Sequence, residues 1–408
     1  MRKYFDVLRN TISNSAEQHM SSIQAQRIAL LIDTSVTFSS LVIRGVAQYA
    51  HEQPAWQILL QPRGVRDHTS VPRHWDVDGV ITRVTHRTQA AALQRLGIPV
   101  INVSRSIVPD FPFPQVRIDE RETAALAATH LLERGFRSLA YYCVPNQPNY
   151  IDQMGPSFEE AAVRGGGICS NFKQWRRKKT SSNVTLAELE TWLHTLPKPV
   201  GVLAWDAEHG HFLCEACASA GLQIPEEVAI VCGEDDELFC QISYPPLSAV
   251  DCGPERVGYE SAALLARCLA GEKVQTTPIQ ISPVSVLSRH STDVLAMDDR
   301  ELAQALEYLR SHAYETLQIS DVLRQIPLSR RALELRFRKT LGRSPAAELR
   351  RLRINKAKSL LTNTNWPMPK IAAASGFSQT EIMNRIFRRE LQQTPTQYRR
   401  ATRTSKII

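Results

Sequence analysis

The pattern of this 408-residue sequence changes near residue 290, and this change constrains the fold more than any other feature. Between Arg27 and about Pro283, short apolar runs such as IALLI and GVLAW alternate with stretches of helical period. Continuous apolar strands alternating with helices predict parallel sheets covered on both faces. A stretch of about 260 residues is long enough for two such sheets. After Arg300 the strand pattern is absent, and short helices separated by turns follow.

The charge is divided along the same line. From Arg300 to Ile408 there are 22 Lys and Arg against 8 Asp and Glu, whereas the rest of the chain holds 27 and 33. A basic module on a mildly acidic body is typical of a nucleic-acid-binding domain joined to a domain of another kind.

Composition narrows the class of protein further. Apolar residues make up 43% of the chain, as in globular proteins, and no window approaches the roughly 18 apolar residues of a membrane span. The N-terminus lacks the apolar core of a signal peptide. We therefore expect a cytoplasmic protein that does not contact a membrane and whose 8 cysteines are reduced.

These observations predict an α/β body with two doubly wound parallel sheets, one in each of two lobes, followed by an all-α domain with two helix-turn-helix motifs. The expected segments are an N-terminal extension over 1–26, the α/β body over 27–290, which the resemblance described below implies to be a sensor, a linker over 291–299 and the helical domain over 300–408. One sensor lobe is expected over about 27–135 and 253–272, and the other over about 136–252 and 273–290. The helix-turn-helix motifs are expected over about 318–341 and 367–390.

Ligands of open parallel sheets bind at the carboxyl ends of the strands, and polar residues follow several of the apolar runs. The candidates for effector binding are Asp33, Asp206, Glu234 and Asp235, with the aromatic residues Phe38 and Trp205 nearby. Carboxylates accept hydrogen bonds from paired hydroxyls, and an aromatic face covers the apolar side of a sugar ring. We therefore expect a small polyhydroxylated effector between the lobes. The alternative for each Asp is that it caps the following helix.

Two other classes of site compete with a sugar site. His209, His211, Cys214 and Cys217 have a spacing that would place soft ligands on one side of a helix, as zinc requires. A single CxxC in a helix beside a sheet is more often a pair of small core residues, so we expect neither a metal nor a cofactor. The sequence contains no phosphate-binding loop, GxSxG or HExxH motif, so we expect no catalytic residues and no enzyme.

The C-terminal segment carries several motifs in order. They are G-x-S-P, R-x-x-x-A-x-x-L-L, I-A-x-x-x-G-F, R-x-F-R-R and T-P-x-x-Y-R. Together they resemble the DNA-binding domain of AraC-type transcription regulators over about 298–400. The preceding body resembles LacI-type and periplasmic-binding-protein sensors through V-x-x-D from Val116, HLLERGFRSLAY, GLQIPEEVAIV and PLSAVD. A sensor followed by an AraC-type domain is the domain order of xylose-operon regulators.

The resemblance implies double-stranded promoter DNA, RNA polymerase, a sugar effector and a second copy of the chain as partners. By family correspondence and helical phase, the residues expected to read bases are Arg330, Arg331, Glu334, Thr380, Glu381, Asn384 and Arg385. The residues expected to hold phosphates are Arg338, Lys339, Arg388 and Arg389. The alternative for any one of these arginines is a solvated surface charge.

This sequence departs from the xylose-operon group at the acidic corner of the sensor. Cys232, Gly233, Glu234 and Asp235 replace the usual Gly-Val-Asp-Asn, and Leu335 stands where the group often has Arg. The implied function is a sugar-responsive activator of carbohydrate-utilisation genes. The departures keep two alternatives open, a sugar other than xylose or an effector-independent DNA-binding regulator whose sensor only dimerises.

Overall fold

The computed structural model describes residues 25–52, 56–60, 76–143, 149–175, 184–293, 299–315, 317–341, 343–364 and 366–404. The chain divides into two compact units. Of the described residues, those up to Arg117 and Pro254–Ile279 form the first unit, and those from Ile118 to Gly253 and from Gln280 onward form the second.

The first unit is built on a four-stranded sheet whose pairings are all parallel, in the order β2-β1-β3-β4. The strands are β1 (Gln26–Leu31), β2 (Trp56–Leu60), β3 (Gly79–Thr82) and β4 (Val100–Asn102). The helices are α2 (Thr37–Glu52), α3 (Arg87–Gln94) and α10 (Pro254–Leu269). Residues on β1 and β3, such as Ile28 and Val80, are fully buried, as expected for strands covered on both faces.

Helices α2 and α10 of the first unit cross at two glycines. A Cβ added to Gly258 would lie 1.9 Å from the backbone oxygen of Val42, and one added to Gly45 would lie 1.9 Å from the backbone oxygen of Glu255. Only glycine at these two positions allows the backbones to approach so closely.

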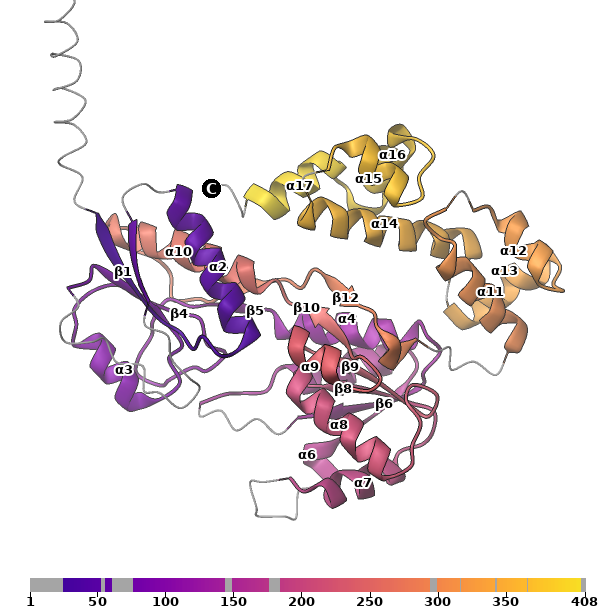
Figure 1. Ribbon diagram of the computed structural model, residues 1–408, viewed down its shortest axis with the longest axis horizontal. Coiled ribbons are helices and arrows are strands. Elements are labelled where there is room, and N and C mark those ends of the chain that lie inside the picture. Colours follow the sequence, from indigo (N-terminus) through magenta and orange to yellow (C-terminus); the bar gives the residue numbers. More distant parts are fainter. Residues whose placement is uncertain are drawn as a thin grey trace, which may run out of the picture. The chain divides into compact units, whose positions relative to one another are not determined.

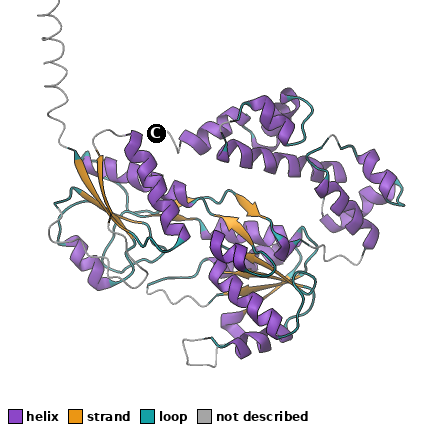
Figure 2. Ribbon diagram, in the orientation of Figure 1, coloured by secondary structure: helices purple, strands orange, loops and turns teal. Residues whose placement is uncertain are grey.

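The second unit contains a six-stranded sheet in the order β12-β10-β9-β8-β6-β7, in which the edge strand β12 is antiparallel to β10 (Figure 2). The strands are β6 (Ser138–Tyr142), β7 (Ile168–Asn171), β8 (Val200–Ala204), β9 (Val228–Cys232), β10 (Ser248–Asp251) and β12 (Ser285–Leu287). A separate short pair joins β5 (Val116–Ile118) to β11 (Ile279–Ile281). The helices are α4 (Glu120–Leu132), α5 (Met154–Arg164), α6 (Phe172–Trp175), α7 (Leu186–Thr195), α8 (Ala207–Ser219), α9 (Glu237–Ile242) and the 3-10 turn η1 (His290–Thr292).

The helical domain also belongs to the second unit and has two hydrophobic cores. Its helices are α11 (Arg300–Ser311), α12 (Ile319–Gln325), α13 (Arg330–Leu341), α14 (Pro345–Asn363), α15 (Met368–Ala374), α16 (Thr380–Leu391) and α17 (Pro395–Thr404). Helix α14 runs from one core to the other, since Leu349 packs in the first and Ala357 in the second (Figure 1). The predicted fold class, parallel α/β layers followed by a helical domain, is confirmed.

The boundaries inside the sensor differ from those expected. Helix α4 was expected in the first lobe, but it packs against α5 and strands β8 to β10, so the chain enters the second unit at Ile118. Ser291 and Thr292, expected in the linker, are fully buried, and the Ser291 hydroxyl donates to the Ile230 carbonyl at 2.6 Å. Gln26 already belongs to β1. Residues 1–24 of the expected extension and 294–298 of the expected linker lie outside the described residues.

Candidate functional site

The two helix-turn-helix motifs are α12 with α13 and α15 with α16. A capping box of Gln318 and Asp321 begins α12. The Ser329 hydroxyl accepts from the Ala332 backbone N–H at 3.2 Å at the start of α13. The turn before α16 contains Gly376 at φ +78°, the left-handed region that favours glycine.

Helices α13 and α16 bury the same pattern of positions. Leu333 and Phe337 on α13 are fully buried, as are Met383 and Phe387 on α16. The remaining side chains form a polar face on each helix. Its exposed members are Arg330, Arg331, Arg338 and Lys339 on α13 and Glu381, Arg385, Arg388 and Arg389 on α16. Glu334, Thr380 and Asn384 are partly exposed.

The structure therefore groups the predicted base-reading and phosphate-binding residues on these two faces. Two of the arginines have acidic neighbours, since Arg330 lies 3.5 Å from Glu334 and Arg389 lies 2.7 Å from Glu390. At such exposure these ion pairs are weak, so DNA phosphates can compete with them. An exposed leucine, Leu335, also lies on the α13 face, and sequence reasoning did not count it among the site residues.

Arg353 of α14 holds the connection between α11 and α12. Its guanidinium donates to the carbonyls of Ala313 at 2.7 Å and Glu315 at 2.9 Å. It thereby satisfies carbonyls that follow the end of α11 and lack helical partners. Sequence reasoning used Arg353 only as the first residue of the R-x-x-x-A-x-x-L-L motif, and an arginine within the long helix was the available signal.

A buried ion-pair cluster connects the second sensor lobe to the helical domain within the second unit. Glu133, just after α4, lies 2.8 Å from Arg343 and 2.8 Å from Arg351. Glu348 of α14 accepts from Arg351 through both carboxylate oxygens, at 2.7 and 2.9 Å. Burial alone would raise the pKa of Glu348, but Arg351, followed by other arginines, holds this pKa below its ordinary value.

Next to this cluster, His130 of α4 is buried. It hydrogen-bonds the Thr292 hydroxyl at 2.8 Å, and Arg134 donates to the Thr292 carbonyl at 2.7 Å. Burial, followed by the charges of Arg134 and two other arginines, lowers the pKa of His130 well below its ordinary value. The sequence analysis quoted these residues in HLLERGFRSLAY as a family resemblance and missed their role. Several charged residues at and after the C-terminal end of this helix were the available signal.

The predicted effector residues of the second unit follow β8 and β9, which are parallel neighbours, so they lie at one edge of the sheet. Trp205 is buried and donates from its indole N–H to the Tyr150 hydroxyl at 3.1 Å. Tyr150 in turn donates to Glu120 at 2.7 Å. Tyr150 and Glu120 were missed because a loop tyrosine and an acidic first helical turn are common features of sequences.

The carboxylates at this edge contact protein groups. Asp206 caps α8, since its Oδ1 accepts from the His209 backbone N–H at 2.8 Å and lies 2.7 Å from the His209 ring. Asp235 lies 2.9 Å from Arg289. Glu234 is partly exposed.

The two predicted effector residues of the first unit follow β1. Asp33 accepts from both the backbone N–H and the hydroxyl of Ser35, at 2.8 and 2.7 Å. Phe38 is partly exposed in the first turn of α2. Asp206 therefore caps a helix, as the alternative reading expects, whereas Asp33 closes a local turn with Ser35.

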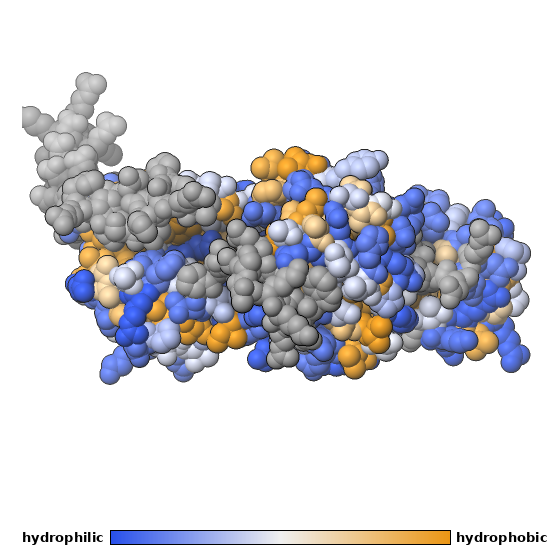
Figure 3. All heavy atoms as spheres, turned by 90° about the horizontal axis from the view of Figure 1, so that it is seen from below, coloured by the Kyte–Doolittle hydropathy of each residue, from blue (hydrophilic) through white to orange (hydrophobic). Residues whose placement is uncertain are grey.

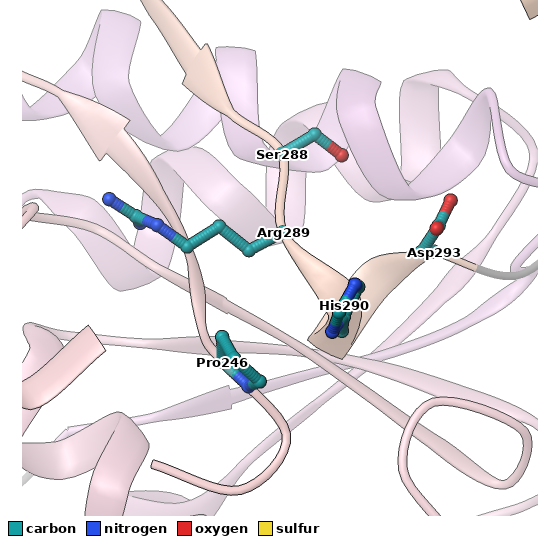
Figure 4. Close-up of a pocket in the computed structure, with 5 residues that line it drawn as sticks. All are labelled: Pro246, Ser288, Arg289, His290 and Asp293. Atoms are coloured by element: carbon teal, nitrogen blue, oxygen red, sulfur yellow. The ribbon is translucent and has the colours of Figure 1, made fainter. Parts of the chain in front are cut away.

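A hollow of about 550 Å³ lies beside the acidic corner of the second unit and is lined by Pro246, Ser288, Arg289, His290 and Asp293. The Arg289 side chain extends away from Asp293 (Figure 4). Arg289 also donates to the Leu247 carbonyl at 2.7 Å, so it serves the packing around β10 as well as Asp235. The hollow contains none of the predicted effector residues.

The zinc alternative does not gain support from geometry. Cys214 and Cys217 are buried in the core of the second unit, and burial raises the pKa of both thiols to about 12. His211 hydrogen-bonds Ser243 at 2.9 Å. Among the described residues, no three His, Cys, Asp or Glu side chains are grouped so that they could hold a metal ion. All 8 cysteines lie in described segments and are free thiols.

Among the described residues drawn in Figure 3, hydrophobic ones form patches separated by polar ones. Apolar surface in that part of the chain therefore does not by itself mark an interface. Within the described segments, every helix is too short or too polar to cross a membrane.

Three family models match the chain in succession. A model described as the XylR N-terminal domain matches residues 27–119, a periplasmic binding protein-like domain matches 128–292, and a helix-turn-helix domain matches 322–401. These matches coincide with the sheets of both units and with the two helix-turn-helix motifs.

Characterised relatives match almost the whole length. The xylose operon regulatory protein of Haemophilus influenzae is 28% identical over 389 residues, which cover 92% of this chain and 98% of that protein. The protein of the same name from Escherichia coli K12 is 27% identical and covers 91% of this chain and 96% of its own. The solved structure of the xylose-binding transcription activator xylR is 25% identical, has a TM-score of 0.57 and covers 92% of this chain and 98% of that one. Over more than nine tenths of its length the chain is therefore similar to xylose operon regulatory proteins, with a periplasmic binding protein-like domain before a helix-turn-helix domain.

Proposed function

We propose that this protein is a cytoplasmic, sugar-responsive activator that binds promoter DNA as a homodimer and acts through RNA polymerase. The observation that carries the proposal is the pair of helices α13 and α16, which turn matching basic faces outward from separate cores. Two such helices in one domain enter successive segments of the major groove about one helical turn apart. Arg and Lys at the ends of the faces neutralise phosphates, so DNA affinity falls steeply as salt is added.

The proposed effector is a sugar, and two lines support this. The matched relatives are named xylose operon regulatory proteins, and the matched structure is titled as xylose-binding. In this chain, the indole of Trp205 and the carboxylate of Asp206 follow β8, beside Glu234 and Asp235 after β9. An aromatic face with neighbouring carboxylates matches the apolar and hydroxylated faces of a sugar.

The function is binding and not catalysis. The relatives are named as regulatory proteins, which supports this reading. Effector binding acts on DNA through the cluster around Glu133, which ties the second sensor lobe to α14.

The test uses the full-length protein and duplexes selected by it from a randomised pool. DNA affinity and thermal stability are measured with a panel of pentoses, hexoses, uronic acids and sugar phosphates. A true effector at a hundredfold excess over its Kd stabilises the native state by about 2.7 kcal/mol and changes the affinity for the selected duplex. The bound stoichiometry by analytical ultracentrifugation should be two chains per duplex.

Asp206→Asn sharpens the test, because Asn removes the charge but still caps a helix. We expect this variant to bind the selected duplex normally and to lose the sugar response. Glu226→Gln, an exposed change of the same kind in the same unit, should keep the response. If no duplex is enriched over the random pool, the protein is not a sequence-specific regulator.

An effector-independent regulator is the second candidate, favoured by the protein contacts of the carboxylates. Asp33 is bound by Ser35, Asp206 by His209 and Asp235 by Arg289. A selected duplex whose affinity is the same with every compound of the panel would establish this candidate and exclude the sugar response.

A further inference from the structure

The outward-facing position of the first recognition helix is occupied by an apolar residue. Leu335 is 68% exposed on α13. It follows the buried Leu333 by two residues and precedes the buried Phe337 by two, so at about 100° per residue it points away from both. Leu335 is also not among the described residues that pack against the core of this motif.

The corresponding position of the second recognition helix is occupied by an arginine. Arg385 lies two residues after the buried Met383 and two before the buried Phe387, and it is exposed. The two helices therefore present the same geometry with different chemistry at the centre of the face.

Leu335 is flanked by cations. Arg331 lies one turn before it and Arg338 one turn after it, and both are exposed. A basic face that meets phosphates brings its central residue to the floor of the major groove. Leucine has no donor or acceptor, and the only apolar group that base edges offer in this groove is the C5 methyl of thymine.

We propose that Leu335 reads a thymine methyl, while Arg385 reads a guanine in the neighbouring groove segment. Each protein chain then recognises an asymmetric site with a thymine-containing part under α13 and a guanine-containing part under α16. This inference rests on the proposed function, since it names how the same DNA interface chooses its sequence.

The test replaces single thymines by deoxyuridine, which lacks the C5 methyl but keeps the same hydrogen-bonding edge. The full-length protein is measured at fixed salt on a duplex that it selected from a random pool, with each thymine changed in turn. Replacing one thymine on the α13 side by deoxyuridine should lower the affinity of the protein for the duplex about fourfold. This factor corresponds to the loss of one buried methyl group.

Variants of the protein test whether Leu335 is the residue that contacts this thymine methyl. Leu335→Ala should lower affinity for the thymine duplex by a similar factor and remove the deoxyuridine effect at that position. Leu335→Arg should shift selection there toward guanine. Leu238→Ala, a matched leucine that is 61% exposed on α9, should bind DNA as the wild type does.

Failure of the inference is distinguishable from failure of the proposed function. If no duplex is enriched, both are overturned. If a duplex is enriched but Leu335→Ala shows the same deoxyuridine effects as the wild type, Leu335 does not read a thymine methyl and the regulator stands. A Leu335→Ala protein with unchanged DNA affinity and lost activation would also overturn the inference, since Leu335 would then contact another protein.

Discussion

Replacing Glu133 by Gln should weaken the connection between the second sensor lobe and the DNA-binding domain. The side chain of Glu133 is only 9% exposed, and its two oxygens face Arg343 at 2.8 Å and Arg351 at 2.8 Å. Gln has nearly the same size, so the change removes charge without opening a cavity. Its effect therefore reports the ion pairs rather than the packing.

The expected loss of stability depends on which carboxylates remain beside Arg343 and Arg351. Removing one partner of a buried ion pair costs about 3–5 kcal/mol because the other charge stays buried. Glu348 remains 2.7 Å from Arg351 and 3.5 Å from Arg343, so each arginine keeps one carboxylate. We expect a loss at the lower end, about 3 kcal/mol, which lowers Tm by about 6–12 °C.

Scanning calorimetry of the full-length protein measures this loss, and DNA titrations with and without effector measure its consequence. We expect a lower Tm for the second unit, and DNA binding that responds less to effector. Glu122→Gln is the matched control, since Glu122 is exposed on α4, the helix that Glu133 follows. Equal Tm values and equal effector responses for Glu133→Gln and the wild type would refute the idea that this cluster transmits the signal.

Three further changes probe other parts of the molecule. Gly258→Ala should destabilise the first unit by about 1–3 kcal/mol in urea unfolding, because its Cβ would meet the Val42 oxygen at 1.9 Å; an unchanged midpoint would show that α2 and α10 separate easily. Acidification should destabilise the second unit, because the folded state keeps His130 neutral and lowers its pKa. The contribution of His130 to stability is complete above the ordinary histidine pKa of about 6.5. Below that pH the free energy of unfolding decreases by at most about 1.4 kcal/mol per pH unit. His130→Gln should reduce that slope between pH 7.5 and 5.5, and parallel pH profiles would argue against this role. Arg385→Ala should weaken binding to a selected duplex by about 1–3 kcal/mol and change binding to random DNA little, whereas equal losses on both would reassign Arg385 to a phosphate.

The layers of the fold could be predicted because a strand that is buried on both faces of its sheet needs an apolar residue at every position. Strands such as GVLAW are apolar throughout, and the helices between them have their own period. The lobe boundary expected near residue 135 differs from the structure because the sequence of α4 does not show which sheet the helix covers. Which sheet such a helix covers is decided by contacts with α5 and β8, which are distant in the sequence.

The recognition helices could be located from the sequence, but the junction, which is the set of ion pairs between Glu133 and the arginines Arg343 and Arg351, could not. The burial of Leu333, Phe337, Met383 and Phe387 follows from helical spacing, so the exposed faces could be predicted residue by residue. The junction instead joins Glu133 to Arg343 and Arg351, more than two hundred residues away. Long-range ion pairs leave no periodic signal, and many other charged pairs along the chain would have matched equally well.

The strength of the junction also bounds the effector response that it can transmit. A ligand shifts an equilibrium only by its differential affinity for the two states, and typical couplings are about 1–3 kcal/mol, or about 5–150-fold in affinity. The contribution of about 3 kcal/mol expected for Glu133 is at the upper end of this range. If closing of the sensor breaks both ion pairs of Glu133, the change in DNA affinity can approach about 150-fold. If it breaks only the pair with Arg343, Glu133 stays paired with Arg351 at 2.8 Å and the response is correspondingly smaller.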